Sequence, residues 1–302
     1  MKITATKKII FSGHQGGIYG LTYGNSPKII FSGSSDKFVG SWNVLSGQQE
    51  EFAIEFPSPV YSLLYLNERN LLLAGTGGGT FHVIDVISKT ITSTTTLHAA
   101  QIFDLAHSPK HSLIFSASGD GYFCVLNAHT LEKMSSTKIC EEKVRSVAVN
   151  SNEDLLAVTS GNGSIHIFSL PDLKQITSFP AHTLSTNTVC WHPEGKYLLS
   201  GGRDAHLKVW DAKNNFELLQ DIPAHNFAIY HIAFSPDEKL FATASRDKSM
   251  KIWDAETFQL LVRCGKDGQD GHKNSVNRLL WNENGLVSGA DDRSMIVWEV
   301  VE

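Results

Sequence analysis

The sequence predicts an all-β fold: a single domain over residues 1–302 that is a seven-bladed β-propeller of four-stranded antiparallel blades. Three observations predict it. A pattern of 42 to 45 residues recurs seven times, each copy holds short runs with period-two alternation, and no window sustains a helical period. Four short strands in a repeat of this length are typical of a propeller blade.

Three columns of residues stay in step along the chain and establish the repeat. A large apolar residue ends the third expected strand of each copy, at Trp42, Ile84, Leu126, Phe168, Trp210, Trp253 and Trp298. A second column lies 28 residues earlier, or 26 in the last copy, at His14, Phe56, His98, Cys140, His182, His225 and His272. A third lies six residues before the first, at Asp36, Gly78, Asp120, Asn162, Asp204, Asp247 and Asp292.

The sixth repeat shows the expected strands most clearly, in the runs IYHIAF, LFATAS, MKIWD and FQLLVRC. The seventh repeat offers only three such runs before the sequence stops. The first residues of the chain align with the outermost strands of other repeats, because Phe11, Phe179 and Ile222 each lie three residues before the His column. We therefore expect residues 3–11 to complete the last blade and to close the ring.

Composition argues against several classes of protein. A net charge of −5 disfavours a general nucleic-acid binder, which needs a basic surface to displace counterions. The four cysteines have no metal-like spacing and lie in or beside apolar runs, as free thiols do in a reducing compartment. No stretch approaches the roughly 18 apolar residues of a membrane span. These features predict a cytoplasmic protein without cofactor or metal, a monomeric ring able to join a larger complex.

Four segments carry a resemblance to a known family: SGSSDKFVGSWN, SGGRDAHLKVWD, TASRDKSMKIWD and SGADDRSMIVWE, each preceded by Gly-His or Ala-His. They resemble WD40 repeats, and the resemblance covers essentially the whole chain. It implies the propeller fold more than any one function. It also implies a non-catalytic scaffold or adaptor for protein–protein interaction.

Four repeats combine a His, a Ser or Thr, an Asp and a Trp, which suggests the Ser-His-Asp set of acyl-transfer enzymes. Four copies favour instead a structural hydrogen-bond tetrad in each blade, as the resemblance implies. The tetrads are His14, Ser32, Asp36, Trp42; His182, Ser200, Asp204, Trp210; His225, Thr243, Asp247, Trp253; and His272, Ser288, Asp292, Trp298.

The other three repeats depart from the tetrad in an ordered way. Repeat three keeps His98, Ser116 and Asp120 but has Leu126 in place of the Trp. Repeats two and four have lost the polar set largely together, with Phe56, Ala74, Gly78, Ile84 and with Cys140, Val158, Asn162, Phe168. Such joint loss is expected, because one stranded buried partner costs about 1–3 kcal/mol whereas replacing the whole set by apolar groups can be nearly neutral.

The resemblance implies that partners contact the face carrying the His-column loops and the Asp hairpins. Exposed positions there are expected three and five residues after the His column and one before the Asp column. The partner-binding candidates are Tyr19, Tyr61, Phe103, Lys143, Arg145, Asn187, Arg203, Tyr230, Arg246, Asn277 and Asp291. Aromatic residues and arginines dominate binding energy at interfaces, so we expect aromatic contacts on one side and an acidic or phosphorylated group on the arginines.

Two alternative functions stay open. A propeller enzyme or small-ligand carrier would use the central channel, although the repeat spacing is broken only by a four-residue extension before His272. Nucleic-acid binding would use a basic patch on blades four to six, formed by Lys143, Arg145, Arg203 and Arg246, and is disfavoured by the net charge.

Three further motifs favour ordinary structure over ligand binding. Residues 75–80, GTGGGT, lack the closing Gly-Lys-Ser/Thr of a phosphate loop and predict a hairpin tip. His107 and His111 lie across a strand-to-turn junction without a third metal ligand nearby. Asp267 and Asp270 lack the alternating ligands and the terminal Glu of a calcium loop.

Overall fold

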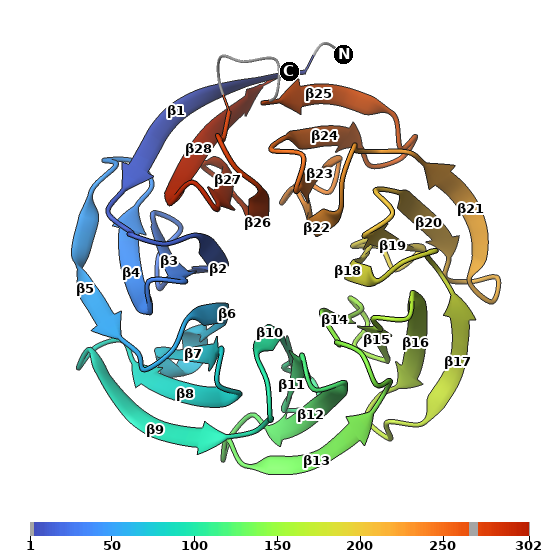
Figure 1. The fold of residues 1–302 in the computed structure, drawn as a ribbon, viewed down its shortest axis with the longest axis horizontal. Coiled ribbons are helices and arrows are strands. Elements are labelled where there is room, and N and C mark those ends of the chain that lie inside the picture. Colours follow the sequence, from blue (N-terminus) through green and yellow to red (C-terminus); the bar gives the residue numbers. More distant parts are fainter. Residues whose placement is uncertain (1–2, 266–270, 302) are drawn as a thin grey trace. The chain divides into compact units, whose positions relative to one another are not determined.

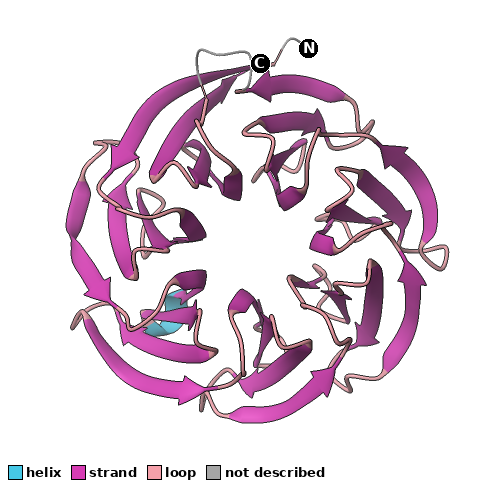
Figure 2. Ribbon diagram, in the orientation of Figure 1, coloured by secondary structure: helices cyan, strands magenta, loops and turns pink. Residues whose placement is uncertain are grey.

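The computed structural model describes residues 3–265 and 271–301, so Asp267 and Asp270 lie outside the described residues. Strands make up the regular structure apart from one helical turn, η1 (Asn67–Arg69), in the part of the chain that is described (Figure 2). Within these same residues there is no helix with the length and apolar character needed to cross a membrane.

Seven four-stranded antiparallel sheets form the fold, and their strand orders follow the repeats found in the sequence (Figure 1). We number the blades accordingly: β2–β5 form blade one, and each following set of four strands forms the next blade as far as β22–β25 in blade six. Blade seven has the order β1-β28-β27-β26. The fold is therefore an all-β seven-bladed propeller, and the predicted fold class is confirmed.

The chain divides into two compact units, the first comprising Met1–Thr76, Phe81–Thr94 and Tyr230–Glu302. It holds blade six from Tyr230 onward, blades seven and one, and most of blade two, while Ile229 at the start of β22 belongs to the second unit. Its strands are β22 (Ile229–Phe234), β23 (Leu240–Ser245), β24 (Met250–Asp254), β25 (Leu260–Cys264), β26 (Val276–Asn282), β27 (Gly285–Ala290), β28 (Ser294–Val301), β1 (Thr4–Ser12), β2 (Ile18–Tyr23), β3 (Ile29–Ser34), β4 (Phe38–Asn43), β5 (Gln49–Glu55), β6 (Val60–Leu66), β7 (Leu71–Thr76), β8 (Thr80–Asp85) and β9 (Thr90–Thr96).

The second unit comprises Gly77–Thr80 and Thr95–Ile229 and holds blades three, four and five. Its strands are β10 (Ile102–Ser108), β11 (Leu113–Ser118), β12 (Tyr122–Asn127), β13 (Lys133–Lys138), β14 (Val147–Val149), β15 (Leu155–Thr159), β16 (Ser164–Ser169), β17 (Gln175–Pro180), β18 (Thr186–Trp191), β19 (Tyr197–Gly202), β20 (Leu207–Asp211) and β21 (Glu217–Ile222).

Burial explains the composition of the strands within a blade. The second strand is covered on both faces, and β11 reads LIFSAS with every residue buried. The outermost strand has one free edge in water, and β9 reads TITSTTT with every residue exposed. Threonine suits that place because its branched side chain favours extended backbone while its hydroxyl remains solvated.

The N-terminal strand completes the last blade, as the sequence predicts. β1 pairs antiparallel with β28, with Phe11 opposite Met295 and Lys7 opposite Trp298. Phe11 is buried and packs its ring 5.5 Å from that of Trp42 in the next blade. The three strands of the seventh repeat, β26, β27 and β28, therefore form a four-stranded sheet with the N-terminal strand β1.

The position four residues after the His column forms the core, as its apolar character suggests. In the first unit it holds the buried Ile18, Val60 and Val276, and the equivalent Ile102 and Val144 are buried in the second unit. Thr186 is the polar exception, and its hydroxyl is buried with no hydrogen-bond partner. The hairpin predicted at residues 75–80 is confirmed, because Gly75 pairs with Phe81 across β7 and β8.

Candidate functional site

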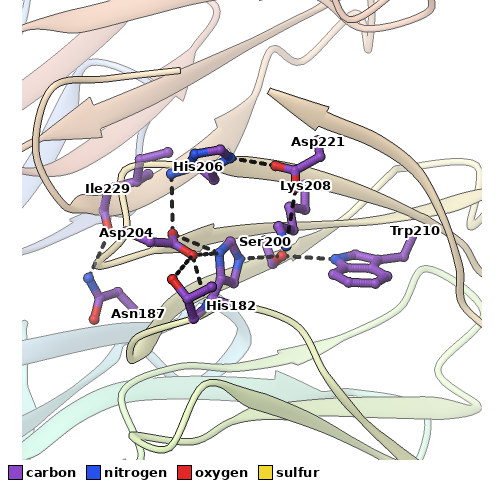
Figure 3. A network of polar contacts seen from close by, with 10 residues as sticks. His182, Asn187, Ser200, Asp204, His206, Lys208, Trp210, Asp221 and Ile229 are labelled. Atoms are coloured by element: carbon purple, nitrogen blue, oxygen red, sulfur yellow. Dashed lines mark hydrogen bonds and ion pairs between the residues drawn. The ribbon is translucent and has the colours of Figure 1, made fainter. Parts of the chain in front are cut away.

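Blade five carries a complete tetrad (Figure 3). His182 lies in the loop before β18, Ser200 on β19, Asp204 in the β19–β20 hairpin and Trp210 on β20. His182 Nδ1 lies 2.9 Å from the Asp204 carboxylate and Nε2 lies 2.8 Å from Ser200 Oγ. Trp210 Nε1 donates to the same Oγ at 2.9 Å. The tetrad therefore ties two strands, one loop and one hairpin of the blade together.

Donor and acceptor chemistry fixes the direction of each hydrogen bond in this tetrad. An indole N–H can only donate, so Ser200 Oγ accepts from Trp210 and uses its own hydrogen toward His182 Nε2. The proton of a neutral His182 then resides on Nδ1 and is donated to Asp204. Each group therefore donates one hydrogen bond to the next, from the indole through the hydroxyl and the imidazole to the carboxylate.

Burial alone would raise the pKa of Asp204, but the hydrogen bond from His182 and the amides of Thr183 and His206 lower it well below its ordinary value. The network continues outward, because His206 and Lys208 both contact the Asp221 carboxylate (Figure 3). The Asp204 carboxylate is thus held ionised at the hairpin tip.

The same bonds recur in other blades with nearly the same lengths. In blade one, His14 lies 2.8 Å from Asp36 and 2.7 Å from Ser32, and in blade seven His272 lies 3.1 Å from Asp292 and 2.7 Å from Ser288. The indoles of Trp42 and Trp298 donate to these serines at 2.7 and 2.8 Å. In blade six, Trp253 donates to Thr243 at 3.0 Å.

Access to the serine hydroxyls decides what this arrangement can do chemically. Ser32, Ser200 and Ser288 have exposed fractions of 0 %, and each Oγ already binds both an imidazole and an indole. A nucleophile needs an approaching substrate and an open acceptor direction, and these hydroxyls have neither. The geometry supports a structural role for the tetrads.

Blades two and four fill the His, Ser and Trp positions of the tetrad with Phe56, Ala74 and Ile84 and with Cys140, Val158 and Phe168. In blade two, Phe56 occupies the His position and its ring lies 5.0 Å from His82. In blade four, Phe168 packs against Phe123 at 5.2 Å. Each of these blades carries a histidine two residues before the apolar column, His82 or His166, with at least one buried ring nitrogen that has no hydrogen-bond partner. Burial lowers the pKa of both imidazoles.

Partner-binding candidates of the first unit include a tyrosine pair. The rings of Tyr19 and Tyr61 stack with centroids 5.0 Å apart and planes 5° apart. Burial, followed by the Asp291 carboxylate, raises the pKa of Tyr19 to about 12. Asn277 Nδ2 also donates to Asp291, at 2.7 Å. Four predicted residues of blades seven, one and two are thus brought together, while Tyr230 is half-buried and Arg246 is exposed.

Candidates of the second unit form a cationic cluster around one ring. Arg145 lies with its guanidinium 4.9 Å from the Phe103 ring centre, and Lys143 places its ammonium at 5.8 Å. Both cations lie close to the ring, where the negative quadrupole of the aromatic faces attracts them. Arg203 projects from the blade-five hairpin and is exposed.

Asn187 differs from what the sequence predicts. It was expected on an exposed position, but it is 7 % exposed and its Nδ2 donates to the carbonyl of Ile229 at 3.1 Å (Figure 3). The expectation of exposure is wrong because the short side-chain amide reaches a strand carbonyl of the next blade. Asn277, at the equivalent place in blade seven, likewise donates to the Ile18 carbonyl at 3.1 Å.

Sequence reasoning missed a polar column six residues after the His column. In the second unit it holds Asp104, Ser146 and Thr188, all buried, and Ser146 Oγ donates to Asp104 at 2.9 Å. In the first unit it holds His231, whose pKa is lowered by burial and by Arg278. The sequence does contain a sign of this column: a polar residue recurs at one fixed position in first strands that are otherwise largely apolar. Two bonds of this column join neighbouring blades: Ser146 to Asp104, and the Leu279 amide to His231 Nδ1.

In the described part of the chain no three His, Cys, Asp or Glu side chains are grouped so that they could hold a metal ion. His111 instead uses Nε2 to contact the Glu153 carbonyl at 2.7 Å.

The WD40 family model, described as WD domain, G-beta repeat, matches residues 5–43, 89–127, 134–169, 173–211, 216–254 and 263–299. Residues 44–88 lie outside these matches and include most of blade two, one of the two blades without the polar set. The matches cover most of the chain and agree with the sheets and hydrogen bonds described above. The chain belongs to the WD40 repeat family.

Proposed function

We propose that the chain is a non-catalytic interaction platform that binds a protein or peptide segment at the loop ends of its blades. Each of these ends carries a His-column loop and a hairpin, joined in blades one, three, five and seven by the His–Asp bond. WD40 propellers typically act as protein-interaction scaffolds. Rigid loop ends suit that role, because a preordered surface loses little entropy on binding.

The observation that carries the proposal is the cationic cluster on Phe103. Lys143 is exposed and Arg145 half-buried, so their charged groups are positioned yet reachable. Arginine binds carboxylates and phosphates through paired N–H donors. The cluster therefore supports a partner with an acidic or phosphorylated group, while the Tyr19–Tyr61 pair supports an aromatic contact.

Affinity capture followed by mass spectrometry tests this proposal. The triple variant Arg145→Ala, Tyr230→Ala, Arg246→Ala should lose specific partners that the wild type retains. A matched control is Lys174→Ala, Leu218→Ala, Arg263→Ala, three exposed residues on or beside the outermost strands, which should retain them. An identical partner set for all three proteins overturns the proposal. Capture of RNA or DNA with a steep salt dependence would favour nucleic-acid binding instead.

A further inference from the structure

The loop ends of blades five and six carry two exposed apolar side chains. Leu184 lies in the loop before β18 and is 50 % exposed, and Phe227 lies in the loop before β22 and is 57 % exposed. Both follow the histidine of their tetrad by two residues. The equivalent residues of blades three and four are Ala100 and Glu142, so the propeller fold itself does not require a large apolar group at this place.

An arginine stands on the hairpin that connects with both of these loops. The Arg203 amide donates to the Ser185 carbonyl at 2.8 Å, in the loop before β18. The His225 amide, in the loop before β22, donates to the Ala205 carbonyl at 3.2 Å. The hairpin is thus bonded to both loops, which places it between the two exposed apolar residues.

Side chains hold the same segments in place (Figure 3). Asp204, the residue after the arginine, lies 2.9 Å from His182 and accepts from the Thr183 amide at 3.0 Å. Asn187 donates to the Ile229 carbonyl at 3.1 Å and so joins the first strands of the two blades. A surface that is ordered before binding loses little entropy when a partner docks on it.

The charge on this surface is positive. Arg203 is exposed, whereas only 9 % of the Asp204 side chain is exposed because its carboxylate is held by the tetrad. The exposed neighbours on the two loops, Thr183 and Asn226, are uncharged. A guanidinium binds a carboxylate or a phosphate through paired N–H donors, and arginine and phenylalanine are enriched at protein interfaces. The surface therefore combines one cation with two apolar groups.

We propose that Leu184, Arg203 and Phe227 bind an extended segment of a partner protein in which an acidic side chain lies between two bulky apolar ones. Alternate residues of an extended chain point to the same side, so a segment with the pattern apolar–x–acidic–x–apolar presents its three groups in the order of the surface. The acidic group is a carboxylate or a phosphate, since both share the chemistry that the guanidinium recognises. This binding mode rests on the function proposed above and gives the chemistry of the partner at one part of the loop ends.

Titration of the isotope-labelled full chain with the synthetic peptide Ser-Phe-Ser-Glu-Ser-Phe-Ser, followed by amide NMR, tests the proposal. Saturable shifts are expected at residues 183–187, 202–206 and 225–229. Peptides with Gln in place of Glu, or with Ser in place of both Phe, should bind about fivefold more weakly, because each lacks one class of contact. A peptide with phosphoserine in place of Glu separates the two acidic groups: tighter binding assigns phosphate, and weaker binding assigns carboxylate.

Substitutions of exposed residues show whether the peptide binds at this surface. In Arg203→Gln the Glu and Gln peptides should bind equally, because the charge that distinguishes them is gone. Leu184→Ser combined with Phe227→Ser should weaken the Glu peptide about fivefold, whereas Leu218→Ser, a similarly exposed leucine on β21, should leave it unchanged. The proposal is overturned if the wild type shows no saturable shifts in the three segments, or if Arg203→Gln prefers the Glu peptide as strongly as the wild type does.

Affinity capture separates failure of this surface from failure of the interaction platform. If the wild type captures specific partners and the triple variant Leu184→Ser, Arg203→Gln, Phe227→Ser retains all of them, this surface is excluded while the platform stands. A wild type that captures no specific partner contradicts the platform, whereas peptide binding that responds to Arg203→Gln still supports this surface.

Discussion

Blades four and five are neighbours in the same unit, but they fill the four tetrad positions with side chains of opposite character. Blade five joins its hairpin to its strands through His182, Ser200, Asp204 and Trp210. Blade four holds Cys140, Val158, Asn162 and Phe168 in those places, and Val158 and Phe168 lie in an apolar cluster with Phe123. The strand register is nevertheless the same, with Val158 opposite His166 and Ser200 opposite Lys208.

The comparison shows that a blade needs a consistent set of groups more than any particular set. A polar chain is stable when every donor has its acceptor, and an apolar cluster is stable when nothing polar is left in it. Mixed sets are costly because they strand a buried partner. Blade four carries one such residue, His166, whose two ring nitrogens are buried without a hydrogen bond.

The largest difference between the two blades should follow removal of the hairpin residue. Asp204→Ala strands His182 and two backbone amides, and we expect it to lower the free energy of unfolding by about 3 kcal/mol. Asn162→Ala loses only bonds within its own hairpin and should cost about 1 kcal/mol or less. Urea denaturation of both variants measures the difference, and equal losses would contradict the role given to the tetrad.

A smaller effect is expected from the indole. Trp210→Phe keeps an aromatic ring beside Phe179, 4.8 Å away, but removes the donor to Ser200 Oγ. The expected loss is about 1–2 kcal/mol, since one buried acceptor is left unsatisfied. Adding Ser200→Ala to this variant should cost less than Ser200→Ala costs alone, because the two groups share one bond. Strict additivity in thermal or urea unfolding would argue that they act independently.

The smallest expected difference between blades four and five lies in how the free energy of unfolding depends on pH. Burial lowers the pKa of His166 below 6.5, so the unfolded chain takes up this proton first and stability falls as pH drops from about 6.5 toward the folded pKa. The pKa of Asp204 is lowered below 3.8, so its contribution is complete above about pH 4 and is lost only as pH falls further.

Unfolding curves between pH 7 and pH 3 test this ordering. His166→Gln should reduce the slope between pH 6.5 and pH 5, whereas Asp204→Asn should leave that slope unchanged and reduce the loss below pH 4. A slope between pH 6.5 and 5 that is unaffected by His166→Gln would show that this imidazole does not titrate with folding.

Much of the fold was predictable because each column of the repeat holds side chains with a distinct physical role. The columns at His14, Asp36 and Trp42 recur with fixed spacing, and they led directly to seven sheets and to the pairing of β1 with β28. Column positions also identified the neighbours Phe103 and Arg145. They could not reveal that the arginine already covers the phenylalanine ring.

The remaining errors depend on how far a side chain extends and how much space it fills, and the sequence spacing of the columns carries neither quantity. Asn187 occupies a position expected to be exposed, yet its short amide meets a carbonyl of the next blade and the side chain is buried. Leu126 was visible as a departure from the tryptophan column. Leu97 and Cys124 stand where blade one has Gly13 and Gly40 against its Trp42 ring, and both are buried, so in blade three these side chains take part of the place of the indole.

One measurement tests the central claim most directly: transplanting the blade-four set into blade five. The quadruple variant His182→Cys, Ser200→Val, Asp204→Asn, Trp210→Phe replaces the polar chain as a whole, and its unfolding free energy is compared with that of Asp204→Ala alone. If tetrads are stable as complete sets, the quadruple variant loses less stability than the single one. A quadruple loss equal to the sum of the four single losses would contradict the account.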